Sequence, residues 1–302
     1  MRRLNFFGIV LLVAVTAIGL SGCSENSVGV FPHPVLGAPA NLGEGTVSAY
    51  ADFDDSGAPA AIGVVFSANA LGSLPSGSDL HHCFDRNGDG VVDEASECTL
   101  CHERVLQLPS KASTRSDMPF KWSLVNWNPE GHIPPGVYDL PHFDIHFYMD
   151  PIEDIFAIQA GPCGVEFIRC DQLELALKPL PPNYRHPDFQ DVGAAAPAMG
   201  NHLIDPTAPE FHGEAFTRTW IYGKYDGRVI FYEEMLTLEY ILSRPNECSS
   251  IKSPEAVALS GYYPTESCVR HNAQTDEYTV SVEEFVLREA SPPDPIPEEP
   301  QS

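Results

Sequence analysis

Residues 141–149, PHFDIHFYM, hold the pattern that most constrains the fold of this chain. In an extended strand successive side chains point to opposite faces, so His142, Asp144 and His146 share one face. The alternate positions are Phe143, Ile145 and Phe147, which share the other face. One face can therefore pack into a core while the other presents two imidazoles and a carboxylate. The pattern predicts a half-buried strand with a polar site on its outer face.

The same strand spacing limits which residues can share a metal ion. On a straight strand His142 and His146 lie about 13 Å apart, too far for one ion unless a bulge or strong twist brings them together. Two further candidate ligands are His202 and Glu233. Glu233 falls on the inward face of a predicted strand at 228–235, where a carboxylate is costly unless it is paired or bound to metal.

These residues predict a divalent metal held by two or three of His142, His146 and His202, together with Glu233 or Asp144. Imidazole and carboxylate ligands suit Zn, Mn, Fe or Cu. The alternative is a buried network in which the histidines hydrogen-bond Asp144 and tyrosine hydroxyls and only support the fold.

The N-terminus predicts export and lipidation. A positively charged start and a short apolar run at 6–18 are typical of a secretory signal, and the run is too short to span a membrane. Residues 20–23, LSGC, resemble a bacterial lipobox, which implies a signal peptide of residues 1–22 and a palmitate-type anchor on Cys23. Ser24 then implies sorting to the outer membrane. We expect a cell-envelope lipoprotein that contacts the membrane through its lipid.

The net charge is −25, from 42 acidic and 17 basic residues. Because nucleic acid is also negatively charged, this protein would repel it, and we expect no nucleic-acid partner. Such a surface attracts divalent cations instead. The sequence is compatible with a homo-oligomer.

Composition divides the chain into a flexible tether at 23–44, a β domain at 45–288 and a disordered tail at 289–302. We expect an all-β domain, an antiparallel β-sandwich or barrel-like fold with few short helices. An Asp-Gly pair at 226–227 predicts a tight hairpin turn within it. A loop-rich, Cys-containing insertion is expected at about 74–101.

The insertion contains a calcium-type loop. Its DxNxDG pattern supplies oxygen ligands at alternate positions, and a glycine makes the sharp turn. The expected ligands are Asp85, Asn87, Asp89, the carbonyl of Val91, and Asp93. The pattern departs from an EF-hand at its twelfth position, where Ser96 replaces the usual glutamate.

The chain has eight cysteines, and an oxidising compartment favours disulfides. Cys163 and Cys170 close a short loop and are expected to pair. Cys248 and Cys268 flank a segment containing proline and tyrosine and are also expected to pair.

The remaining cysteines allow two interpretations. Cys98, Cys101 and His102 match the attachment motif of a c-type haem, with His102 as the proximal ligand. Alternatively, these cysteines pair within the insertion, where Cys83 is the third candidate.

Several short motifs together resemble a little-characterised family of exported bacterial β-domain proteins. The family is a domain of unknown function similar to a Thermus protein under extracytoplasmic sigma-factor control. The motifs are residues 127–132, 141–148, 199–205, 222–227, 231–235 and 261–265. The resemblance spans about 47–286 without the insertion, and it implies an all-β fold and a shared polar site but no reaction. Where the family has Glu-Pro before Met, this chain has Glu233-Glu234.

Three functional classes follow. The first, which we favour, is an envelope metal-binding module. The second is a metal-dependent enzyme, although no catalytic residue is assigned. The third is an electron-transfer lipoprotein carrying haem. The motifs of serine hydrolases, zincins and nucleotide-binding enzymes are not found in the sequence.

Overall fold

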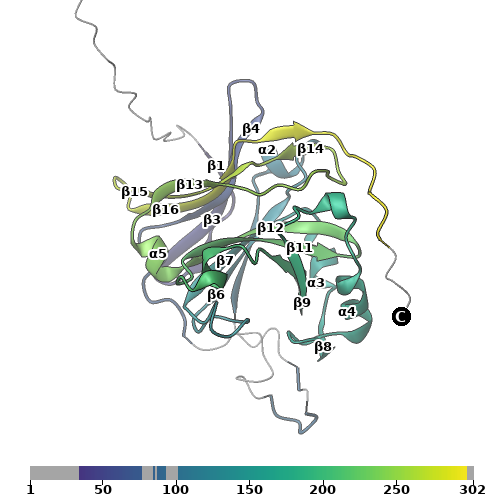
Figure 1. The fold of residues 1–302 in the computed structure, drawn as a ribbon. Helices are drawn as coiled ribbons and strands as arrows, with labels where there is room; N and C mark the ends of the chain where they lie inside the picture. The colour runs from purple at the N-terminus through teal and green to yellow at the C-terminus, as the bar shows by residue number, and fades with distance from the viewer. Residues whose placement is uncertain (1–33, 77–83, 86, 93–100, 298–302) are drawn as a thin grey trace, which may run out of the picture. The chain divides into compact units, whose positions relative to one another are not determined.

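The computed structural model describes residues 34–76, 84–85, 87–92 and 101–297, and its regular structure is dominated by antiparallel sheets (Figure 1). The first large sheet has the order β1-β3-β4-β16-β15-β13, and β2 also pairs with β3. Its strands are β1 (Val35–Leu36), β2 (Ala40–Leu42), β3 (Gly45–Phe53), β4 (Pro59–Phe66), β13 (Asn246–Ser250), β15 (Glu266–Asn272) and β16 (Glu277–Glu283).

The second large sheet has the order β5-β6-β7-β12-β11-β10-β9 and carries the polar site. Its strands are β5 (His102–Gln107), β6 (Trp122–Asn128), β7 (His142–Tyr148), β9 (Gln190–Ala196), β10 (Gly200–Ile204), β11 (Arg218–Tyr225) and β12 (Arg228–Thr237). A small separate sheet pairs β14 (Gly261–Tyr263) with β17 (Val286–Arg288), and β8 is Ala160–Cys163.

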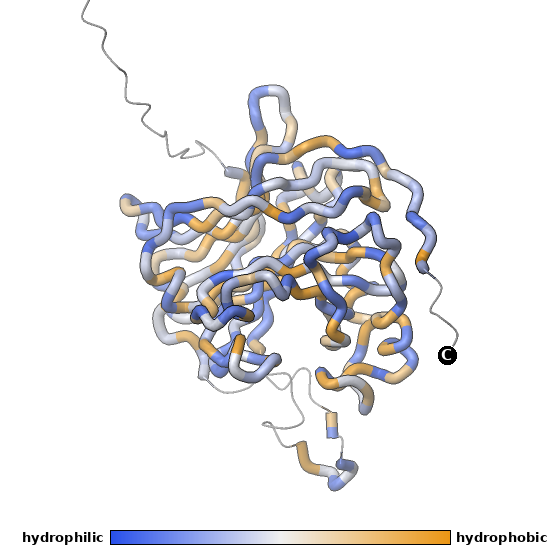
Figure 2. The backbone as a smooth tube through the Cα atoms, in the orientation of Figure 1, coloured by the Kyte–Doolittle hydropathy of each residue, from blue (hydrophilic) through white to orange (hydrophobic). Residues whose placement is uncertain are grey.

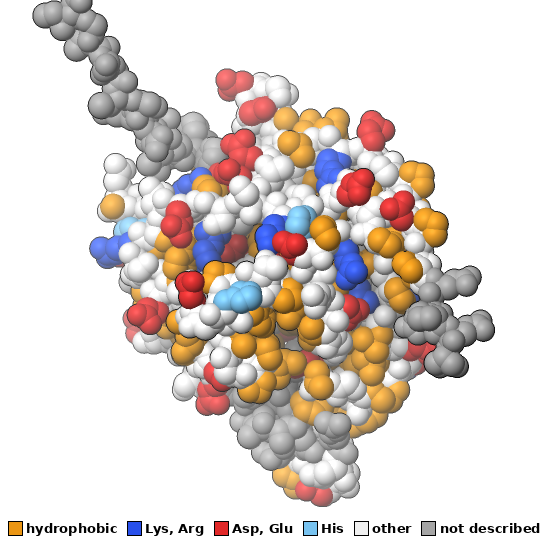
Figure 3. Space-filling view, viewed as in Figure 1, with side chains coloured by type: hydrophobic (Ala, Val, Ile, Leu, Met, Phe, Trp, Pro, Cys, Tyr) orange, Lys and Arg blue, Asp and Glu red, His pale blue; other side chains and the backbone are white. Residues whose placement is uncertain are grey.

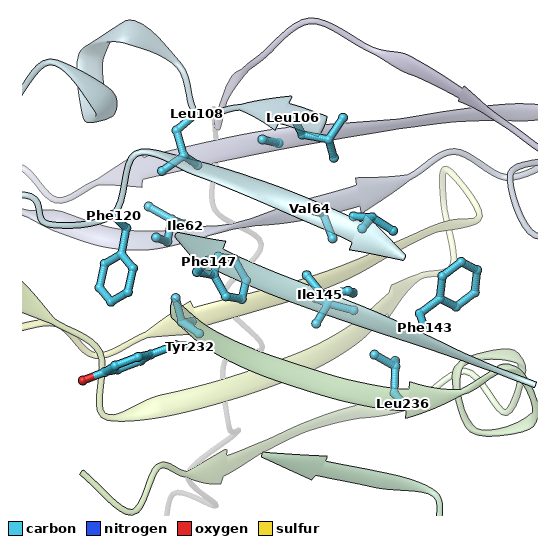
Figure 4. Close-up of a cluster of buried hydrophobic side chains, with 14 of the residues drawn as sticks. Ile62, Val64, Leu106, Leu108, Phe120, Phe143, Ile145, Phe147, Tyr232 and Leu236 are labelled. Atoms are coloured by element: carbon cyan, nitrogen blue, oxygen red, sulfur yellow. The ribbon is translucent and has the colours of Figure 1, made fainter. Parts of the chain in front are cut away.

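The main hydrophobic core joins side chains from both large sheets. Val64 and Phe66 of β4 contribute from the first sheet, and Phe143, Ile145 and Phe147 of β7 contribute from the second. The rings of Phe66 and Phe143 lie 5.3 Å apart across the interface. Figure 4 shows Val64, Phe143, Ile145 and Phe147 among the apolar side chains between the strands. The fold is therefore an all-β sandwich with few short helices, as the sequence predicted.

The tight turns between strands are formed by residue types that favour turn conformations. Asp226 and Gly227 have φ of 48° and 75°, and they connect the paired residues Tyr225 and Arg228. Positive φ at both central positions is characteristic of a two-residue hairpin loop whose twist matches the strands, which confirms the predicted turn. The polar turn at 54–58 between β3 and β4 is the hydrophilic loop at the top of Figure 2.

The α-helices among the described residues are short: α2 (Ser110–Ser113), α3 (Ile152–Phe156), α4 (Cys170–Leu177) and α5 (Leu238–Leu242), with 3-10 turns η2 (Pro182–Tyr184) and η3 (Pro209–His212). Both predicted disulfides are confirmed. Cys163, at the end of β8, bonds Cys170, the first residue of α4, and Cys248 bonds Cys268 across the paired strands β13 and β15.

Both ends of the β domain extend beyond the boundaries that composition indicates. Val35 of β1 pairs with Ala51, so the sheet begins within the segment expected to be a tether. In the segment expected to be a disordered tail, the Ser291 N–H donates to the Val257 carbonyl, and the Tyr184 hydroxyl donates to the Ser291 carbonyl. Short segments rich in Gly and Pro look disordered in isolation, whereas here the neighbouring chain supplies their hydrogen-bond partners.

Several predictions fall on residues that the structure does not describe. These are the signal peptide at 1–22, the lipidation site Cys23, most of the insertion, and the residues Cys83, Asp93 and Cys98. Their assignments stay predictions.

Candidate metal site

The outer face of β7 carries the polar pattern that the sequence predicted. His142, Asp144 and His146 are at most 5% exposed, and they lie on the strand face opposite the side chains that β7 contributes to the main core. Strand spacing separates the two histidines, as expected, so each belongs to a different group of candidate ligands. One group is His132, His142 and Asp144, and the other is His146, His202 and Glu233. Within each group the ligand atoms lie within 4.8 Å of one another.

The second group gathers residues from three strands. His146 of β7 lies directly opposite Glu233 of β12, and His202 of β10 reaches the same carboxylate across β11, where it pairs with Gly223. The Nε2 atoms of His146 and His202 lie 3.6 and 3.9 Å from the two carboxylate oxygens of Glu233. The register thus brings together His146 and Glu233, which are 87 positions apart in the sequence.

A backbone carbonyl orients one imidazole of this group, because Nδ1 of His202 lies 2.8 Å from the Ala194 carbonyl. Nδ1 of His146 has a longer contact of 3.4 Å with the Leu124 carbonyl. A proton on Nδ1 leaves Nε2 with a lone pair directed at Glu233, the arrangement that metal-ligating histidines adopt.

Burial keeps the group uncharged in the absence of a cation. It lowers the pKa of His146 to about 3 and also lowers the pKa of His202. Burial, assisted by the charge of Asp144, raises the pKa of Glu233 well above its usual value. An ion at this position would supply the positive charge that stabilises the carboxylate.

The distances in this group match a metal better than a hydrogen-bond network. An N–H···O hydrogen bond needs about 2.7–3.2 Å between heavy atoms. Ligands on a tetrahedral ion with bonds of about 2.0–2.2 Å lie about 3.4 Å apart. Nε2 of His146 and Oε2 of Glu233 are buried without a hydrogen-bond partner among the described residues. Such orphaned atoms are rare in folded proteins and call for a ligand or ion.

The first group has shorter distances between its atoms, although Nε2 of His142 and Oδ1 of Asp144 are also buried without a hydrogen-bond partner among the described residues. Nε2 of His142 and His132 lies 3.1 and 3.3 Å from the two oxygens of Asp144, which also accepts a 2.7 Å hydrogen bond from Asn128. Burial opposes protonation of His132, but the Asp144 carboxylate outweighs it and raises the pKa of His132 to about 9. Burial likewise opposes ionisation of Asp144, yet His142 and His132 hold its pKa well below the usual value. This group fits the network interpretation, although its atoms are also close enough for an ion.

Phe231 positions the second group from its side. Its ring lies 4.8 Å from that of His146 and 5.5 Å from that of His202, measured between centroids. This placement depends on Gly223, because a Cβ there would lie 1.9 Å from a Phe231 ring atom. The ring occupies the space left by the glycine and fills the gap between the two histidines.

A cavity of about 780 Å³ lies over both groups. Its polar lining includes Asn126, Asp144, Glu166, His202 and Glu233. Its apolar lining includes Val192, Met199, Ile204, Phe211, Ile221 and Met235. The size is within the range of about 300–1,000 Å³ that is usual for small-molecule sites.

The strand pattern predicted the shared face of His142, Asp144 and His146 and the separation of the two histidines, but it did not indicate which other residues join each histidine. His132 lies on the loop between β6 and β7, and its approach to Asp144 depends on the path of that loop. Glu166 gave no signal, since it reaches the cavity from the loop closed by Cys163 and Cys170. The glycine at position 223, opposite an aromatic residue, is a signal for close approach that could have been used.

The described part of the calcium-type loop has the expected local geometry. Asp85 accepts hydrogen bonds from the N–H groups of Gly88 and Gly90, and Asp89 accepts one from Val91. Because Asp93 lies outside the described residues, calcium binding stays a prediction.

The haem motif is only partly described. His102 begins strand β5, and the buried Cys101 lines the cavity. Haem attachment also needs Cys98, so the haem interpretation stays a prediction as well.

Comparisons with protein-family models, with curated proteins and with solved structures find no match. The resemblance to the exported β-domain family is therefore still an expectation from the sequence. Among the described residues, no helix is long and apolar enough to cross a membrane.

Proposed function

We propose that this protein binds one divalent transition metal ion through His146, His202 and Glu233. The observation that carries the proposal is the pair of Nε2 lone pairs aimed at a buried carboxylate over distances too long for hydrogen bonds. Three protein ligands leave a fourth position, which faces the cavity. Two imidazoles and one carboxylate suit zinc best among the available ions, with Mn, Fe and Cu as alternatives.

The proposal places this metal centre on a lipoprotein of the cell envelope. Cleavage before Cys23 would leave the sandwich tethered to a membrane by its lipid, and the acidic chain would concentrate divalent cations near it. In this role the protein acts as a metal-binding module of the envelope, with calcium bound separately by the loop at 85–93.

Elemental analysis by plasma mass spectrometry tests the proposal directly. The sample is the mature chain with Cys23→Ser, loaded with zinc and then dialysed. We expect about one zinc ion per chain, lost in His202→Ala and retained in His212→Ala, because His212 is exposed on η3. Retention of zinc in His142→Ala would support a proton-based network in the first group. A chain that binds no transition metal contradicts the proposal.

A second candidate function is a metal-dependent enzyme, and one observation favours it. Glu166 lines the same cavity, and burial raises its pKa, so it could exchange a proton with a molecule bound at the metal. The visible spectrum of a cobalt-substituted protein tests this second function. A spectrum that changes on adding azide indicates an exchangeable fourth ligand, which catalysis at the metal requires, and an unchanged spectrum contradicts the enzyme function.

A further inference from the structure

The cavity is much larger than a metal ion and its waters require. Its volume of about 780 Å³ corresponds to roughly 26 water molecules at about 30 Å³ each. Filling such a space with water alone would leave an extensive apolar wall hydrated inside the protein.

Much of the cavity lining is apolar and continues to the surface, and part of it lies beside the polar groups, since Ile221 pairs with Glu233 and Met235 pairs with Asp144. Ile204, Phe211, Ile221 and Met235 line the interior, and Val192 lies at the rim with 53% of its surface exposed. Figure 3 shows hydrophobic side chains gathered over the lower half of the face in view, with charged side chains mostly above them. An apolar molecular body would fit this wall.

A second observation points to an absent polar partner. The side chain of Asn126 lines the cavity and is fully buried, and neither its Nδ2 nor its Oδ1 has a hydrogen-bond partner among the described residues. A buried amide without hydrogen-bond partners is destabilising, so a bound molecule with polar atoms would account for it.

The charge at the metal selects the head group. Two neutral imidazoles and the Glu233 carboxylate leave a divalent ion with an excess of one positive charge. The neighbouring Asp144 is already paired with His132 and His142. A monoanionic oxygen donor in the fourth position would neutralise this buried charge.

We infer that the cavity binds a small amphipathic carboxylate. Its head group completes the coordination of the metal, and its apolar body packs against the apolar lining formed by Ile204, Ile221 and Met235. This inference rests on the proposed metal site. It goes beyond that site by naming the class of ligand that the remaining space accepts.

Calorimetric titration of the zinc-loaded mature chain with hexanoate, octanoate and decanoate tests the inference. We expect affinity to rise about fourfold per methylene, the increment for burying each CH₂ group. Decan-1-ol and acetate should both bind at least tenfold more weakly than decanoate, because each lacks one half of the ligand. Metal-stripped protein should show the same loss for decanoate.

Variants at the rim provide a matched comparison. Val192→Glu places a negative charge beside the incoming carboxylate and should weaken decanoate binding about tenfold. Val286→Glu changes an equally apolar and similarly exposed side chain on β17, outside the cavity, and should leave binding unchanged.

The outcomes separate this inference from the metal proposal. If zinc binds at one per chain but decanoate does not bind, the ligand inference is overturned and the metal site stands. Equal affinity of decanoate and decan-1-ol, or of loaded and stripped protein, would also overturn it. If zinc does not bind, both proposals fail.

Discussion

Replacing Gly223 with alanine should disturb the metal site without changing any ligand. A Cβ at position 223 would lie 1.9, 2.0 and 2.3 Å from three atoms of the Phe231 ring. No side chain tolerates such contacts, so the ring must move. Phe231 is fully buried and packs against His146 and His202, which means that its displacement shifts both histidines.

The expected magnitude follows from the packing around the ring. Overpacking a tight core costs about 1–3 kcal/mol of unfolding free energy. Loss of a group that orients metal ligands lowers metal affinity about 10–100-fold. Phe231→Ala alone should cost about 3–5 kcal/mol, because a large side chain leaves a cavity. In the double variant the added methyl at 223 meets no ring, so it should cost nothing more than Phe231→Ala alone.

Denaturant unfolding of the metal-free proteins measures the stability changes, and competition with a chromophoric chelator measures zinc affinity. Gly72→Ala is the control, since a Cβ there meets no atom closer than 3.4 Å. The steric reasoning is refuted if Gly223→Ala matches Gly72→Ala in stability. It is equally refuted if the penalty of Gly223→Ala persists in the double variant.

Two further predictions concern buried charges elsewhere in the sandwich. Arg218→Met removes the cationic partner of Glu234, whose side chain is only 2% exposed, and should lower the unfolding free energy by about 3–5 kcal/mol in denaturant titration. Arg169→Met, at an exposed ion pair, is the control and should lower it by about 1 kcal/mol or less. Burial opposes ionisation of Asp191, but hydrogen bonding from Lys224 and a neighbouring amide outweighs it and lowers the pKa of Asp191. Because the pKa is lower in the folded state, ionised Asp191 stabilises the fold fully above the unfolded-state pKa of about 3.9. This stabilisation is lost as the pH falls through the folded-state pKa. The stability gap between wild type and Asp191→Asn, measured by urea unfolding from pH 7 downward, should therefore narrow below about pH 4; a constant gap would contradict this assignment.

The alternation at 141–149 was sufficient to predict the orientation of β7. Apolar side chains at alternate positions must leave water together, so the polar ones are forced onto the other face. The same local logic predicted the Asp226–Gly227 turn, because few residues accept positive φ at both positions. It also predicted the short-range Cys163–Cys170 pair, where the chain between the two sulfurs is short.

Composition was a weaker guide where partners are distant in sequence. The segment at 34–44 is rich in Gly, Pro and Ala, and the segment at 289–294 is rich in Pro and acidic residues, yet both hydrogen-bond to the sandwich. Their order depends on donors and acceptors supplied by other strands, which no local pattern records.

Local sequence patterns therefore specified the candidate ligands and the strand face on which His142, Asp144 and His146 lie. The grouping of these ligands depends on how distant strands and loops come together in the fold. Strand order places His146 opposite Glu233 and brings His202 to it across β11, while the β6–β7 loop delivers His132 to Asp144. The physical reason is that a strand's period sets direction within a few residues, whereas proximity between strands depends on register and loop path across the whole sheet.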